Sequence, residues 1–111
     1  MKVKVINRSA YGLPQYETGQ AAGLDVRANI TESITLGPLE HALVPTGLYV
    51  ELPEGYEMQV RPRSGLAAKH GLSLVNSPGT VDPDYRGEIK VILVNLSNTP
   101  YELKPGERVA Q

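Results

Sequence analysis

Glycine and proline interrupt this chain at short intervals, and their spacing limits what it can fold into. The sequence holds eleven Gly and nine Pro among 111 residues, well above a combined average of about 12%. Pro disrupts helices and central strands, and Gly weakens both, so long regular elements are excluded. The segments between them are short and rich in Val, Ile, Leu and Tyr, which favours β-strands.

Alternation of apolar and polar residues predicts where these strands lie. We expect them at residues 2–6, 43–44, 47–52, 56–61, 87–96, 99–103 and 108–110. The segment 87–96 (GEIKVILVNL) is continuously apolar at its centre, which predicts a strand buried there on both faces. Short strands with turns about every eight to twelve residues predict an all-β fold, a jelly-roll-like sandwich or barrel.

One segment instead predicts a helix. Residues 64–71 (SGLAAKHG) start with Ser, continue with helix formers and basic residues, and end on Gly. Ser is a preferred N-cap, and Gly commonly terminates helices. We therefore expect a helix of about two turns, with Ser64 as its cap.

Composition excludes several classes of protein. Eleven Lys or Arg against twelve Asp or Glu give a net charge of −1, without the positive excess of a protein that binds nucleic acid. There is no Cys, so disulfides, thiol catalysis and Cys-ligated zinc are absent. No apolar run is long enough for a membrane span, and the N-terminus lacks a signal peptide. We expect one cytoplasmic domain, residues 1–111.

The C-terminus is unusual for a natural domain. The chain stops at Gln111, three residues into an apolar strand signal that follows the turn Lys104-Pro105-Gly106. Domains usually end on polar, loosely held residues. We therefore expect the sequence to be a fragment.

The segment Pro62-Arg63-Ser64-Gly65 is a candidate phosphate site. A guanidinium fork, a hydroxyl and a close backbone suit phosphate oxygens. The alternative is that Ser64 only caps the helix and that Arg63 is solvated.

The segment 76–88 (NSPGTVDPDYRGE) is polar between two apolar strand signals. Asn76, Thr80 and backbone amides could read the edge of a planar base, Asp82 could accept a proton from water, and Tyr85 could stack on a sugar. The alternative is a simple turn with Asp82 at its first position and Pro83 at its second. Asp84 is expected on the solvent side of that turn.

Asp25 precedes a strand signal in AAGLDVRA at 21–28. A carboxylate there could hold a hydrated magnesium ion, which prefers oxygen ligands and keeps several waters. The alternative is an exposed Asp paired with a neighbouring Arg. His41 and His70 are isolated, and no G-x-S-x-G motif supports a Ser-His-Asp triad.

Four stretches together resemble a known family. AAGLDVRA at 21–28, PRSGLAAKHGL at 62–72, NSPGTVDPDYRGEIK at 76–90 and PGERVAQ at 105–111 have the order and spacing of the first four motifs of the trimeric dUTP diphosphatases (dUTPases). The resemblance covers essentially the whole chain. It implies a jelly-roll-like subunit, a homotrimer with shared active sites, and magnesium-dependent hydrolysis of dUTP to dUMP and pyrophosphate. That activity limits uracil in DNA and supplies dUMP for dTMP synthesis.

The resemblance also implies roles for single residues on the phosphate side. Asp25 corresponds to the carboxylate that holds a magnesium-bound water. Arg63, Ser64 and Gly65 correspond to the phosphate-contacting segment, and Gln111 to the glutamine that reaches the phosphates.

Further roles follow on the nucleoside side. Asp82 matches the residue that activates the attacking water, and Tyr85 the aromatic that packs on the deoxyribose. The uracil-reading hairpin and the adjoining substrate shell correspond to Asn76, Thr80, Val81 and Lys90.

One part of the family pattern is missing. The fifth motif, a C-terminal arm that closes over the nucleotide, does not occur within the 111 residues, so we expect weak activity or none without it. Three alternatives stay open: a dCTP deaminase of the same fold, a non-catalytic nucleotide- or protein-binding module, and a structural β-sandwich. Asp82 and the D-x-D-Y pattern favour the diphosphatase over the deaminase.

Overall fold

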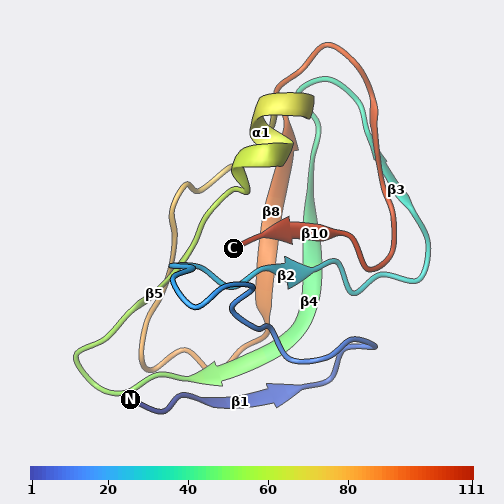
Figure 1. Cartoon of the computed structure of the whole chain (residues 1–111). Helices are drawn as coiled ribbons and strands as arrows, with labels where there is room; N and C mark the ends of the chain where they lie inside the picture. Colours follow the sequence, from blue (N-terminus) through green and yellow to red (C-terminus); the bar gives the residue numbers. More distant parts are fainter.

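The computed structural model describes residues 1–111 as ten strands and one short helix (Figure 1). The helix is α1 (Ser64–His70). The strands are β1 (Lys4–Asn7), β2 (Val26–Arg27), β3 (Ile34–Leu36), β4 (His41–Glu51), β5 (Met58–Val60), β6 (Leu72–Leu74), β7 (Gly79–Val81), β8 (Ile89–Asn95), β9 (Tyr101–Leu103) and β10 (Arg108–Ala110). The prediction of an all-β fold with one helix is confirmed.

Four strands form the main sheet, in the order β1-β4-β8-β6, with every neighbouring pair antiparallel. The remaining strands form three two-stranded ribbons, β2 with β10, β3 with β9, and β5 with β7. In Figure 1, β2 and β10 run across β4 and β8, and the β3–β9 ribbon lies to one side. Pairing between distant segments thus brings residues 26–27 and 108–110 together.

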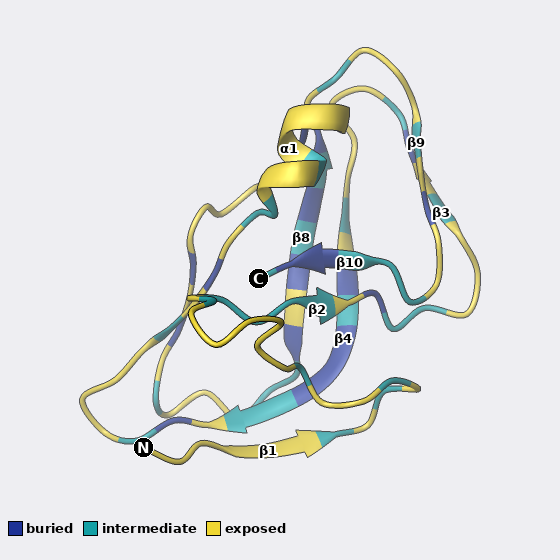
Figure 2. Cartoon of the chain, in the orientation of Figure 1, coloured by how far each residue is buried: buried dark blue, intermediate teal, exposed yellow.

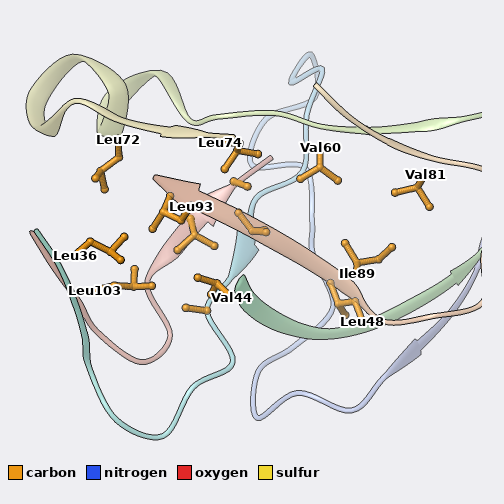
Figure 3. Close-up of a cluster of buried hydrophobic side chains, with 14 of the residues drawn as sticks. Leu36, Val44, Leu48, Val60, Leu72, Leu74, Val81, Ile89, Leu93 and Leu103 are labelled. Atoms are coloured by element: carbon orange, nitrogen blue, oxygen red, sulfur yellow. The ribbon is translucent and has the colours of Figure 1, made fainter. Parts of the chain in front are cut away.

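The core lies between the main sheet and the ribbons. Fifteen buried apolar residues form one cluster. Every strand except β1 contributes to it, β2 through the adjacent residue Ala28. Figure 3 shows the cluster extending along β8, from Leu36 and Leu103 at one end, past Leu93, to Val60 and Val81 at the other. This packing fixes the β5–β7 ribbon, which carries Thr80 and Val81, against the main sheet.

Strand β4 corrects one sequence-based expectation. Segments 43–44 and 47–52 were expected as separate strands because Pro45 and Gly47 lie between or beside them, but they form one strand that bends sharply. The register against β8 shifts between Pro45 and Leu48, where the missing N–H of Pro is tolerated. Gly47 has φ +71°, and a Cβ there would lie 2.7 Å from the Ser9 nitrogen. The bend therefore needs glycine.

The burial of β8 also differs from expectation. Its residues alternate strictly, with Ile89, Val91, Leu93 and Asn95 buried. Lys90 is exposed, and Ile92 and Val94 are half-buried on the opposite face (Figure 2). The apolar run therefore marks one face in the core and a second face only partly covered in the single chain.

Helix α1 covers seven of the eight predicted residues, and its stop is confirmed because Gly71 adopts φ 66° and bonds back to Ala67. Its start is different. The N-cap residue is Arg63, with no side-chain capping bond, and Ser64 is the first helical residue. The predicted capping role of Ser64 is wrong, because the helix begins one residue earlier than expected and the extended chain ends at Arg63.

Candidate active site

The carboxylate of Asp25 lies between two guanidinium groups. Its Oδ1 is 3.3 Å from Arg63 Nε and its Oδ2 is 3.7 Å from Arg108 Nη1. Arg108 Nη2 is also 3.7 Å from Glu17 Oε1. Asp25 is therefore paired with arginines, as the alternative hypothesis predicted. It is not an exposed residue, however, because its side chain is only 20% exposed.

Gln111 lies beside the segment that leads into α1. Its backbone N–H donates to Arg61 O at 2.9 Å, and Arg61 N–H donates back to Gln111 O at 2.7 Å. The Gln111 side-chain amide donates to Pro62 O at 3.3 Å, and its Oε1 packs against Gly23. The first, second and fourth sequence motifs therefore meet at one place.

Arg63, Ser64 and Gly65 occupy the junction between this extended segment and α1. Ser64 and Gly65 are exposed, and Arg63 is half-buried against Asp25. Ser64 does not cap the helix, and its exposed side chain is available to a ligand. No atom lies within 4 Å of a Cβ placed on Gly65, which leaves its backbone approachable.

Asp25, Arg61 and Gln111 line an open groove, which we call the phosphate groove. Its other walls come from the 21–23 turn and from Ser77 and Pro78. Arg63 borders it through its ion pair with Asp25.

Five of the predicted residues line a different hollow, which we call the base groove, of about 660 Å³. The groove lies between the β5–β7 ribbon and the main sheet, and the five are Asn76, Thr80, Val81, Tyr85 and Lys90. Part of the expected polar hairpin is in fact strand, because residues 79–81 form β7 and pair with β5. The two grooves flank the segment 76–78.

The ring of Tyr85 is held in a defined position. Its hydroxyl donates to Glu88 O at 2.8 Å. A Cβ on Gly87 would lie 2.4 Å from that hydroxyl and 2.6 Å from the ring carbon Cζ, so the ring packs over Gly87. Tyr85 therefore presents a fixed aromatic wall at the edge of the base groove.

Asp82 begins the turn that the alternative hypothesis predicted, since Tyr85 N–H donates to Asp82 O at 3.1 Å. Both Asp82 and Asp84 are exposed, and neither lines the base groove or the phosphate groove. Exposure in the single chain thus does not distinguish the two carboxylates. The structure leaves the predicted residues in two groups. Asp82 lies between Val81 and Tyr85 of the base groove in sequence, but it lines neither groove.

Comparison with known proteins identifies the family. The dUTPase family model matches residues 10–111. The deoxyuridine 5'-triphosphate nucleotidohydrolase of Fusobacterium nucleatum is 65% identical over 111 residues, which are the whole chain and 76% of the relative. That of Cytophaga hutchinsonii is 62% identical over 109 residues, 98% of the chain and 71% of the relative. The chain belongs to the dUTPase family.

Solved dUTPase structures share the fold. The dUTPase from phage phi11 of S. aureus superimposes with a TM-score of 0.89 at 22% identity, over 100% of this chain and 87% of that one. The Staphylococcus bacteriophage 80alpha dUTPase gives 0.88 at 25% identity, over 99% and 86%. The jelly-roll-like dUTPase fold is thereby confirmed. The helix is too short to cross a bilayer.

Three charged residues at this candidate site were not singled out from the sequence, namely Glu17, Arg61 and Arg108. Arg61 could have been noticed, because it stands two residues before Arg63 in an extended segment and therefore shares its face. Arg108 and Glu17 carry no such signal, since Arg108 meets Asp25 only through the β2–β10 pairing, and Glu17 meets Arg108 from the loop before β2.

Proposed function

We propose that this protein hydrolyses dUTP to dUMP and pyrophosphate. The residues of the phosphate groove bind the triphosphate, and those of the base groove bind the nucleoside. The observation that carries this proposal is the identity with dUTP nucleotidohydrolases along the whole chain, combined with the meeting of three motifs around Asp25. Neither a structural sandwich nor a simple binding module requires that coincidence.

On the phosphate side, we assign binding to Arg63, Ser64, Gly65 and Gln111. Arg63 supplies a guanidinium that suits paired phosphate oxygens, and Ser64 supplies an exposed hydroxyl at the start of α1. The Gln111 amide is held near Arg61 and Pro62 by backbone and side-chain bonds. Together these groups orient the triphosphate.

The same groove fits a magnesium ion that is bound partly by substrate. No group of three or more acidic or His side chains forms a protein cage for a metal. Mg²⁺ commonly uses one or two carboxylates together with substrate phosphates and waters, and Asp25 offers one carboxylate beside phosphate-binding groups. When bound, the ion would neutralise phosphate charge. Asp25 would hold one of its waters.

On the nucleoside side, we assign uracil recognition to Asn76, Thr80, Val81 and the β7 backbone, with Lys90 in the same groove. The fixed ring of Tyr85 would pack on the deoxyribose. A ribose would place its 2′-hydroxyl against that ring without a partner, which costs about 1–3 kcal/mol. The site therefore selects deoxyribonucleotides.

We assign activation of the attacking water to Asp82. An ionised carboxylate can accept the proton of water that attacks a phosphorus atom. Arg63 and Ser64 cannot act as this base while they bind phosphate. Asp84 is the competing carboxylate on the same turn.

The separation of the two grooves favours a site shared between copies of the chain. Phosphate-binding and base-binding residues do not line one hollow in the single chain, yet dUTP must contact both. We therefore propose a homotrimer in which different subunits contribute the two groups. The half-covered face of β8, with Ile92 and Val94, is available for such contacts.

We also propose that residues 1–111 act as a single dUTPase-like domain in the cytoplasm, with no nucleic acid or membrane among the partners. The balanced charge of −1 agrees with a small-molecule substrate.

The test is turnover of matched nucleotides by the full gene product. Incubation with dUTP and Mg²⁺ should release dUMP and pyrophosphate, while UTP and dCTP should react far more slowly. Ammonia released from dCTP would support the deaminase instead, and dUTP binding without turnover would support a binding module. Light scattering should give a trimer at micromolar concentration, and a monomer would contradict the shared site.

A further inference from the structure

We propose that Arg61 is an additional substrate-binding residue, whose unpaired guanidinium attracts the triphosphate into the phosphate groove. This inference rests on the proposed function. It concerns a residue outside the set that the four motifs assign.

The backbone places Arg61 on the correct face. Residues 59–63 continue the extended path of β5 toward α1, and successive side chains in an extended chain point to opposite sides. Gln59 and Arg61 both line the phosphate groove, whereas Val60 between them is buried in the core. Arg63 follows at the same spacing and contacts Asp25.

The position of Arg61 is also fixed. Its N–H and C=O form the reciprocal pair of hydrogen bonds with Gln111 at 2.7 and 2.9 Å. The Arg61 side chain therefore starts beside Gln111, and Asp25 lines the same groove. Local movement of the backbone cannot carry it away without breaking the contact between the second and fourth motifs.

Charge distinguishes Arg61 from the other arginines nearby. Arg63 and Arg108 are both paired with Asp25, and Arg108 also with Glu17. Arg61 is exposed, and it forms none of the ion pairs in the structure. It is thus the arginine of this groove without an ion pair, since the two carboxylates that line the groove, Glu17 and Asp25, pair with Arg63 and Arg108 instead.

An uncompensated cation at the rim of a groove has a specific effect. It attracts anionic ligands over a distance set by salt screening, and the attraction increases with ligand charge. A triphosphate should therefore respond to Arg61 more strongly than a monophosphate. A purely solvated Arg61, as on any exposed strand, would affect neither.

The experiment compares three variants of the full gene product. Arg61→Gln removes the charge, Arg61→Lys keeps it, and Lys104→Gln removes an exposed charge from a turn that lines neither groove. Binding of the non-hydrolysable imido analogue of dUTP and of dUMP is measured by calorimetry in metal-free buffer. The KM and kcat for dUTP are measured with Mg²⁺ over a series of salt concentrations.

For Arg61→Gln we expect about three- to tenfold weaker binding of the analogue and less than about a twofold change for dUMP. The KM should rise with kcat unchanged, and the salt dependence of KM should become weaker. Arg61→Lys should retain most of the affinity, and Lys104→Gln should match the wild type.

Unchanged analogue binding in Arg61→Gln would overturn the proposal, as would an equal loss for dUMP and the analogue. A lower melting temperature with a matching fall in kcat would assign Arg61 a structural role instead. Failure of the wild type to turn over dUTP would refute the proposed function itself. The wild-type kcat shows that failure independently of any difference between the variants.

Discussion

Arg63 Nε lies 3.3 Å from Asp25 Oδ1, so the residue proposed to bind phosphate directly contacts the residue proposed to hold magnesium. A phosphate and a magnesium ion are themselves oppositely charged and bind next to each other. The pair therefore matches the charge pattern of its ligands, with the cation facing the phosphate and the carboxylate facing the metal. Arg108, on the other side of Asp25, keeps the carboxylate in place if Arg63 moves toward phosphate.

Replacement of Asp25 by Asn should weaken the response to magnesium. The substitution keeps the shape but removes the charge that two arginines and the hydrated metal share, so we expect about a 10- to 100-fold loss in apparent Mg²⁺ affinity or turnover. Pyrophosphate release titrated with Mg²⁺ measures it. Glu54→Gln, which removes an exposed carboxylate that lines neither groove, is the control and should stay near wild type. Equal behaviour of the two variants would remove Asp25 from the metal site.

Asp82→Asn should abolish turnover while binding persists. Asparagine keeps the size and hydrogen bonding of the side chain but is not basic, so we expect about a 10²- to 10⁴-fold fall in kcat. Affinity for the imido analogue should change little. Asp84→Asn serves as the matched control, because it is equally exposed and lies on the same turn. If Asp84→Asn collapses the rate instead, the assignment of the base is reversed.

Gly87→Ala should relax discrimination against UTP, although it replaces no substrate-binding side chain. The new methyl would lie 2.4 Å from the Tyr85 hydroxyl, so the ring must leave its position. Loss of the barrier corresponds to about a 5- to 150-fold decrease in the ratio of kcat/KM for dUTP to that for UTP. Tyr85→Ala should give the same decrease. A preserved ratio in both variants would show that the Tyr85 ring does not exclude the 2′-hydroxyl.

Tyr101→Phe should reduce the sensitivity of folding to alkaline pH. Burial, and then the hydrogen bond and charge of Glu107, raise the pKa of the Tyr101 phenol above its ordinary value of 10.0. Above about pH 10 the Tyr101 phenol loses its proton in the unfolded chain but keeps it in the folded chain. The contribution of Tyr101 to the free energy of unfolding is therefore fully present below about pH 10 and falls as the pH rises.

Urea unfolding between pH 8 and 11 measures this effect. Tyr101→Phe should lose about 1 kcal/mol near neutral pH and decline less steeply at high pH than the wild type. Tyr56→Phe is the control, because Tyr56 is 53% exposed. Parallel pH curves for wild type and Tyr101→Phe would contradict the role of the Tyr101–Glu107 bond.

The sequence by itself determined the class of fold and the types of residue at the site. Frequent Gly and Pro with alternating apolar residues predicted short strands, and SGLAAKHG predicted the only helix, because these signals act within a few residues of chain. Strand bounds were less accurate where Pro45 lies inside β4, since a bulge that depends on β8 and Gly47 accommodates it. Strands β3 and β7 were not expected, because each is short, β7 lies in a segment predicted as a polar hairpin, and each is defined by its pairing with β9 or β5.

Only the tertiary structure decided which functional residues meet. Asp25, Arg63 and Arg108 are far apart in sequence and converge through the β2–β10 pairing and the Arg61–Gln111 bonds. Spacing along the chain carries no information about such contacts, because strand partners are chosen by packing of the whole core. The same packing separated the phosphate groove from the base groove, and it left the guanidinium of Arg61 without a carboxylate partner.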